Sequence, residues 1–236
     1  MKILSIECSA SPASACVIED GKILSSAFVN VKMTHSQTLL PMVKQSLDSA
    51  KLTVDDIEVI AVSAGPGSFT GIRIGIAAVK GLAIKNNTPC VAVSTLSAMA
   101  EVYKSENAVI CAVMDARCNQ VYNALFEVKN GFVTRLCEDR ALMCADLADE
   151  LKSDFSDKKI IVTGDGADLF YPYLSEYKNV CIANEFTKYQ NAIGVGFAAI
   201  NEIENGNVIS PAALLPVYLR LPQAERELKK KLENKE

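Results

Sequence analysis

The chain shows the same succession of apolar and polar segments twice. Each succession begins with an apolar run, at residues 2–9 and at residues 108–117, which carries a carboxylate near its end. A second apolar stretch follows and stops at a turn pair, Asp-Gly at residues 20–21 and Asn-Gly at residues 130–131. Short apolar runs bounded by such turn residues predict strands joined by tight hairpins at the start of each half.

The repetition continues through the next two elements of each half. Helix-like segments occupy residues 35–50 and 144–153, and each is followed by a buried strand that runs into a glycine loop. The two loops are Gly65-Pro66-Gly67 and Gly164-Asp165-Gly166. Five elements in the same order indicate an internal duplication.

A duplicated pair of lobes, with hairpins and glycine loops facing a cleft, resembles the actin-like ATPase (ASKHA) fold. We therefore predict an α/β protein with two actin-like lobes, at residues 1–105 and 106–220, and a short basic tail at residues 221–236. The apolar segment at residues 192–204 is expected to form a helix that packs back across the junction of the lobes.

The composition changes this picture mainly by what it excludes. With 24 basic and 28 acidic residues, the net charge of -4 argues against a broad basic surface for nucleic acid. Eight cysteines without a Cys-x-x-Cys pair favour a reduced, cytoplasmic protein. We expect neither a signal sequence nor a membrane span, because no apolar run approaches the ~20 residues that cross a bilayer.

The buried strand of the first half leads into the glycine-rich motif A-G-P-G-S-F-T-G-I-R-I-G at residues 64–75. A glycine loop at the start of a helix is suited to an anion, because free N–H groups and the helix dipole point the same way. The glycine spacing is one residue too long for a dinucleotide-binding loop, and Ile72 stands where a Walker A loop has its lysine. The meaning of the motif must therefore come from the rest of the chain.

This glycine motif resembles the signature of the TsaB (YeaZ) family. Three further segments support the resemblance: residues 3–9 resemble the opening strand of the family, residues 115–122 its second-lobe hairpin, and residues 216–220 its carboxyl-terminal motif. The resemblance extends from the first residue to about residue 220. It is carried chiefly by the glycine motif, which is the most specific of the four.

The resemblance implies a non-catalytic scaffold in the synthesis of N6-threonylcarbamoyladenosine in tRNA. Members of the family pair with TsaD, a paralogue of the same fold that transfers the threonylcarbamoyl group, and a P-loop ATPase, TsaE, joins them. The resemblance thus implies a heterodimer with a TsaD-type protein, or a homodimer in isolation, with tRNA reached only indirectly. It also implies no tightly bound cofactor, while ATP or ADP and Mg²⁺ belong to the assembled complex.

The residues themselves offer neither a catalytic nor a metal site. A TsaD-type enzyme holds its metal with two histidines on one helical turn, whereas this chain has only His35. Glu7-Cys8-Ser9 also replaces the family's usual Asp-Thr-Ser, which removes a hydroxyl suited to phosphate. The competing hypothesis is an ATP-dependent small-molecule kinase or phosphotransferase of the same fold, with Asp115 or Asp165 as base or Mg²⁺ ligand. A third is an unrelated α/β binding domain.

The matched strand ends and glycine loops define a candidate nucleotide cleft. Its residues are Glu7, Ser9, Asp115, Arg117, Gly164, Asp165 and Gly166. The alternative is purely structural: strand-end carboxylates cap turns, Arg117 pairs with Asp115, and Gly-Asp-Gly is a common turn composition.

The helix after the glycine motif carries small residues on one face, where another helix could approach closely. Gly71, Gly75, Ala78 and Leu82 follow the spacing i, i+4, i+7, i+11. The approaching helix belongs either to this chain or to a partner, and the family resemblance favours a partner. The predicted interface consists of Leu39, Val43, Gly71, Gly75, Ala78 and Leu82. A leucine at Gly75 is then expected to block the partner and leave the fold intact.

Overall fold

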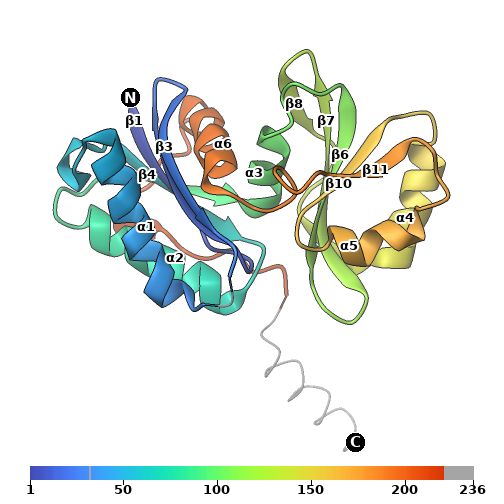
Figure 1. The fold of residues 1–236 in the computed structure, drawn as a ribbon, viewed down its shortest axis with the longest axis horizontal. Coiled ribbons are helices and arrows are strands. Elements are labelled where there is room, and N and C mark those ends of the chain that lie inside the picture. Colours follow the sequence, from blue (N-terminus) through green and yellow to red (C-terminus); the bar gives the residue numbers. More distant parts are fainter. Residues whose placement is uncertain (32, 221–236) are drawn as a thin grey trace, which may run out of the picture.

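The computed structural model describes residues 1–31 and 33–220, and the predicted basic tail at residues 221–236 lies outside the described residues. Two β-sheets stand side by side with helices on their faces (Figure 1). The strands of the first sheet are β1 (Lys2–Glu7), β2 (Ala13–Glu19), β3 (Lys22–Val29), β4 (Val59–Gly65) and β5 (Cys90–Ser94). Those of the second are β6 (Ala108–Asp115), β7 (Gln120–Lys129), β8 (Phe132–Arg135), β9 (Arg140–Met143), β10 (Ile160–Thr163) and β11 (Val180–Ile182). The α-helices are α1 (His35–Ala50), α2 (Phe69–Ala83), α3 (Thr95–Glu101), α4 (Cys144–Asp154), α5 (Ala167–Phe170) and α6 (Ala192–Glu204).

The two sheets share one topology, which confirms the internal duplication. Their strand orders are β3-β2-β1-β4-β5 and β8-β7-β6-β10-β11, with β9 paired to β7. In each sheet the first strand pairs antiparallel with the second and parallel with the strand that leads into the glycine loop. Both hairpin turns, Asp20-Gly21 and Asn130-Gly131, have the positive φ angles expected of their residue types. The chain therefore has the predicted duplicated actin-like ATPase fold.

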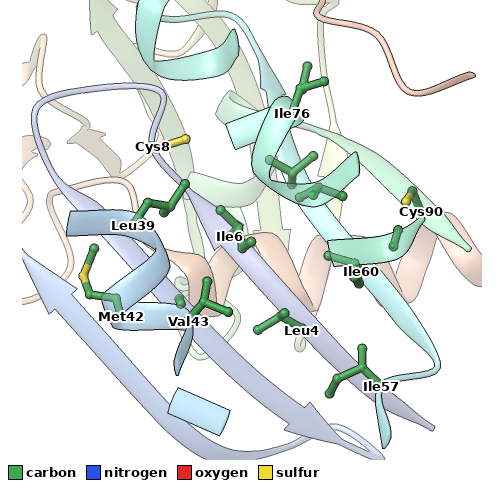
Figure 2. Close-up of a cluster of buried hydrophobic side chains, with 14 of the residues drawn as sticks. Leu4, Ile6, Cys8, Leu39, Met42, Val43, Ile57, Ile60, Ile76 and Cys90 are labelled. Atoms are coloured by element: carbon green, nitrogen blue, oxygen red, sulfur yellow. The ribbon is translucent and has the colours of Figure 1, made fainter. Parts of the chain in front are cut away.

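Strand β1 is buried from both sides, which explains its largely apolar sequence. Leu4, Ile6 and Cys8 belong to the core under α1 and α2 (Figure 2). Ile3 belongs instead to the core under α3 and α6, because successive side chains of a strand point to opposite faces. Helices thus cover both faces of the first sheet, and α3 and α6 lie on the side that faces the second lobe (Figure 1).

Helix α6 follows the second sheet in sequence but packs on the first. Its Val195 and Ala199 share a core with Ile3 and Val91. Ser5 Oγ of β1 also donates a hydrogen bond to the first carbonyl oxygen of this helix at 2.7 Å. Although α6 is strongly apolar, neither it nor any other described helix is long and apolar enough to cross a membrane.

The chain stays on the first lobe after α6. Cys90 and Ile209 exchange two backbone hydrogen bonds of 2.8 and 2.9 Å, and Leu214 is buried in the core under α1 and α2. The Val217 N–H donates to the Ala64 carbonyl oxygen at 2.8 Å. The structure therefore differs from the predicted boundary of the second lobe in its last part, because these apolar residues complete the cores of the first lobe.

Helix α3 forms the apolar part of the junction between the lobes. Its Leu96 and Met99 share a core with Ile110 and Phe126 of the second sheet. Leu96 and Phe126 are both fully buried there. A contact of this kind between buried side chains holds the two sheets in a fixed relation.

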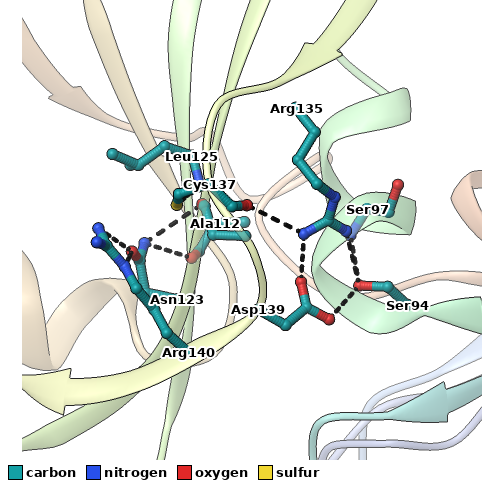
Figure 3. A network of polar contacts seen from close by, with 10 residues as sticks. Ser94, Ser97, Ala112, Asn123, Leu125, Arg135, Cys137, Asp139 and Arg140 are labelled. Atoms are coloured by element: carbon teal, nitrogen blue, oxygen red, sulfur yellow. Dashed lines mark hydrogen bonds and ion pairs between the residues drawn. The ribbon is translucent and has the colours of Figure 1, made fainter.

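A polar network beside α3 adds to this junction (Figure 3). Asp139 accepts hydrogen bonds from Ser94 Oγ and from the Arg135 guanidinium, both at 2.6 Å. Ser94 Oγ also caps α3 by accepting the Ser97 N–H at 3.2 Å. Because Ser94 ends β5 and Arg135 ends β8, the network ties the first lobe to the second.

The small face of α2 is turned toward β1 and away from solvent. A Cβ added at Gly75 would lie 2.5 Å from Cys8 Sγ, and one at Gly71 would overlap the Cys8 carbonyl oxygen. Leu39 and Val43 of α1 are buried in the same core (Figure 2). The assignment of these four residues to a partner interface is therefore corrected: they pack inside this chain, because a glycine face fits against a strand as well as against a helix.

We expect Gly75→Leu to destabilise the first lobe, contrary to the expectation from sequence. The added side chain has no room beside Cys8, and overpacking a core costs roughly 1–3 kcal/mol. Gly81→Leu on the same helix is the matched control, because a Cβ there would have no neighbour within 4 Å. Thermal unfolding should show a midpoint several degrees lower for Gly75→Leu alone. Equal midpoints for the two variants would contradict this packing.

Candidate functional site

A cavity of about 900 Å³ that is open to solvent lies between the two lobes, beside the ends of β1 and β6. Four of the seven predicted cleft residues line it, namely Ser9, Asp115, Arg117 and Asp165, whereas Glu7, Gly164 and Gly166 do not. Lining residues that the sequence reasoning missed include Met33, His35, Phe69, Arg73 and Tyr122. Phe69 and Arg73 belong to the glycine motif, so the motif could have identified them as residues of the site. No sequence pattern pointed to Met33 and Tyr122 as site residues, because the fold alone brings them to the cavity.

The glycines of the two loops allow the backbone to approach the strand ends. A Cβ at Gly164 would overlap the Val113 carbonyl oxygen, and one at Gly166 would lie 2.8 Å from the backbone of the same strand. In the first lobe, Gly67 approaches the carbonyl group of Ser9 in the same way. The loops therefore serve to pack against β1 and β6, and nucleotide contact by Gly164 and Gly166 stays a prediction.

The start of α2 already has partners inside the chain. The Ser68 N–H donates to the Ser9 carbonyl oxygen at 2.7 Å, and Ser68 Oγ accepts the Gly71 N–H at 3.2 Å. These bonds therefore occupy N–H groups that the sequence analysis expected to be free to bind an anion. The loop of the glycine motif thus packs against the end of β1.

His35 also has a structural partner. Its Nε2 donates to the Ala10 carbonyl oxygen at 2.7 Å, which ties α1 to the turn after β1. Within residues 1–31 and 33–220, no three His, Cys, Asp or Glu side chains are grouped so that they could hold a metal ion. The absence of a metal from the working protein stays a prediction.

Glu7 is fully buried at the end of β1. Its Oε1 accepts the Ser9 N–H at 2.5 Å, as a carboxylate that closes a strand-end turn does. Its Oε2 has no hydrogen-bond partner among the described residues. Burial, more than any neighbour, raises the pKa of this carboxyl group and favours its protonated form. An enclosed carboxyl group whose protonated form is favoured in this way is poorly suited to holding Mg²⁺.

The two carboxylates of the second lobe that line the cavity have different surroundings. Asp115 Oδ1 accepts the Arg117 N–H at 2.7 Å and closes the turn after β6, where residues 117–119 all have positive φ. Burial raises the pKa of Asp165 to about 6. Gln190 Nε2 donates to Asp165 Oδ1 at 2.6 Å and opposes that shift, while the charge of Asp115 adds to it.

The carboxyl-terminal motif and the glycine motif form one contact beside the cavity. The Tyr218 ring stacks on Phe69 with centroids 4.4 Å apart, and its hydroxyl accepts a hydrogen bond from Arg73 Nε at 2.7 Å. Arg220 then donates to the Ala116 carbonyl oxygen of the second lobe at 2.9 Å. The segment therefore joins the two lobes, a contact that the sequence reasoning did not predict although it singled out both motifs.

Comparisons with known proteins agree with the resemblance seen in the sequence. The family model described as TsaD, tRNA N6-adenosine threonylcarbamoyltransferase, matches residues 25–225. The Bacillus subtilis tRNA threonylcarbamoyladenosine biosynthesis protein TsaB is 31% identical over 225 residues, which cover 95% of this chain and 96% of that protein.

Two further proteins are similar over different lengths. The tRNA N6-adenosine threonylcarbamoyltransferase of Kosmotoga olearia is 35% identical over 111 residues, covering 41% of this chain and 34% of that enzyme. A crystal structure from Pseudomonas aeruginosa, described as an uncharacterized protein with similarity to peptidase YEAZ, superposes with a TM-score of 0.79 at 27% identity. That superposition covers 93% of this chain and 99% of the other.

We expect Asp165→Asn to stabilise the protein more at pH 7.5 than at pH 4.5. A carboxyl group whose pKa rises from 3.8 to about 6 on folding keeps its proton longer in the native state. Stability therefore falls as the pH rises from about 4 to 6 and stays lower above pH 6, by up to roughly 3 kcal/mol. Asparagine keeps an Oδ1 acceptor for Gln190 and carries no charge.

Chemical denaturation of the variant and the parent at the two pH values measures this difference. If the gap in unfolding free energy between them is the same at both pH values, burial of a charged Asp165 does not limit the stability.

Proposed function

The chain belongs to the TsaB family of tRNA threonylcarbamoyladenosine biosynthesis proteins, and from this we propose that it is a non-catalytic scaffold of that synthesis. It works in the cytoplasm, where it binds and activates a TsaD-type catalytic paralogue. ATP or ADP with Mg²⁺, a TsaE-type P-loop ATPase and tRNA enter through the assembled complex. The observation that carries the proposal is an exposed helix face suited to a second chain of the same fold.

That face is the outward side of α2, which presents small side chains. Thr70, Ala77 and Gly81 are exposed and follow the spacing i, i+7, i+11, so they share one side of the helix. A Cβ at Gly81 would meet nothing within 4 Å. Since the distance between packed helices depends on the side chains at the contact, small residues here permit a close approach.

Apolar side chains border this outward face. Leu40 of the neighbouring α1 is 51% exposed, and Ile74 of α2 is half-buried. Ala78 and Leu82, which the sequence assigned to the interface, are also half-buried, and their part in it stays a prediction. The transferase family model spans both helices, so a TsaD-type partner is expected to carry an equivalent pair. Two equivalent faces pack around a pseudo-twofold axis, as in isologous dimers.

The cleft supports a role without chemistry of its own. Glu7 is enclosed, and His35 is engaged with a backbone carbonyl group. Among the described residues that line the cleft, Asp115 and Asp165 are the carboxylates left to serve as the base and Mg²⁺ ligand that a kinase would need. These two carboxylates therefore decide between the scaffold and the competing kinase hypothesis.

We expect Ala77→Leu to weaken binding of the TsaD-type paralogue at least about tenfold, because the larger side chain holds the partner helix away. Ala145→Leu is the matched control, since Ala145 is an exposed alanine on α4 of the other lobe. Both variants should unfold at the parent's temperature, and calorimetry with the purified paralogue measures the affinity. Parent-like affinity of Ala77→Leu would place the interface elsewhere.

We also expect Asp115→Asn to leave threonylcarbamoyl transfer in a reconstituted mixture within about twofold of the parent. The asparagine keeps the Oδ1 acceptor for the Arg117 N–H, so the turn is retained while the base is removed. Loss of an essential general base costs about 10²–10⁴-fold. Transfer should be assayed at saturating paralogue, where mass action compensates for weaker assembly. A hundredfold loss with the complex still formed would show that this chain takes part in the chemistry.

A further inference from the structure

After the short 3-10 turn at Pro211–Ala213, the chain runs alongside α2. Lys80 Nζ donates to the Ala212 carbonyl oxygen at 3.2 Å, and Arg73 Nε donates to the Tyr218 hydroxyl at 2.7 Å. Arg73 and Lys80 are seven residues apart, about two helical turns, and so lie on one side of α2. The order of the contacts shows that the segment runs antiparallel to the helix.

The other side of α2 faces α1. A Cβ added at Gly71 would lie 3.1 Å from the His35 ring of α1, and Gly71 is about 200° around the helix from Arg73. The exposed small residues Ala77 and Gly81 lie between these two sides. The outward face of α2 around Ala77 and Gly81 is therefore a strip of small side chains, called the floor below. Helix α1 lies along one edge of this floor and residues 212–218 lie along the other.

This second edge displays apolar side chains on a fixed backbone. Leu214 is fully buried, whereas Leu215 is 65% exposed and Val217 is 49% exposed. The backbone is held by the Val217 N–H bond to Ala64, and the Tyr218 ring by its stack on Phe69. A backbone that is already fixed loses little entropy when a partner covers its side chains.

We propose that residues 212–218 form the second wall of the partner surface on α2, with Leu215 and Val217 in contact with the TsaD-type paralogue. This inference rests on the proposed function. The wall is continuous with the small floor that the paralogue's helices are proposed to occupy, and it matches Leu40 on the opposite edge in apolar character. A partner that covers α2 together with Leu40 and residues 212–218 buries all of these apolar side chains, whereas a partner limited to the helix pair leaves Leu215 and Val217 in water.

The test compares the affinity of the paralogue for the parent chain and four variants. Leu215→Glu should weaken binding at least about tenfold, and the milder Val217→Thr about two- to fivefold. Phe132→Glu is the matched control, because Phe132 is 75% exposed on β8 of the other lobe. Ala77→Leu reports separately on the floor. Unfolding midpoints of all variants check that the fold is kept, and Val217→Thr decides the matter if Leu215→Glu unfolds early.

The outcomes separate this inference from the proposed pairing. Parent-like affinity of Leu215→Glu and Val217→Thr, with Ala77→Leu weakened, overturns the second wall and leaves the pairing through α2 in place. Parent-like affinity of all three overturns the pairing surface as well. Weakened self-association in sedimentation, with unchanged binding of the paralogue, assigns the wall to a second copy of this chain and equally overturns the inference.

Discussion

The structure depends on backbone meeting backbone at the ends of β1 and β6, with no side chain between them. Gly67 and Gly71 let the first loop and α2 rest on the backbone of Ser9 and Cys8, and Gly164 and Gly166 let the second loop rest on β6. A carbonyl oxygen in a sheet cannot move aside for a methyl group as the end of a flexible side chain can. Both walls of the cavity are therefore fixed by steric exclusion, and the glycine motif is a packing requirement before it is anything else.

The same constraint explains how much the sequence predicted. Helix His35–Ala50 was predicted with its observed bounds, and both hairpin turns were correct, because periodicity and turn residues act locally. The pattern also found the small face containing Gly71 and Gly75, but a period does not say which side of a helix faces the core. It gave no sign either that Arg73 meets Tyr218, since that contact joins residues 145 positions apart.

The site was predictable to a similar extent. Ser9, Asp115 and Asp165 could be placed at the cavity because duplicated strands end at equivalent points. The complete burial of Glu7 could not be predicted from the sequence, because it depends on how closely the neighbouring loop packs against the strand. The lobes are tied by the apolar contacts of α3, by the network around Asp139 and by Arg220. A cleft held at several points keeps its shape, which suits the scaffold role that we propose for the chain.

The return of α6 to the first sheet also sets the order of events during synthesis. A ribosome releases β1 to β5 first, yet one face of that sheet is covered only in part, by the short α3, until the residues of α6 emerge about a hundred positions later. The second sheet, by contrast, packs against α3, α4 and α5, which all precede its last strand in the sequence. The first lobe begins earlier and is completed later, with apolar strand surface exposed in the interval, and such surface promotes aggregation. Nascent chains stopped before α6 are thus the form of this protein with the greatest need of a chaperone.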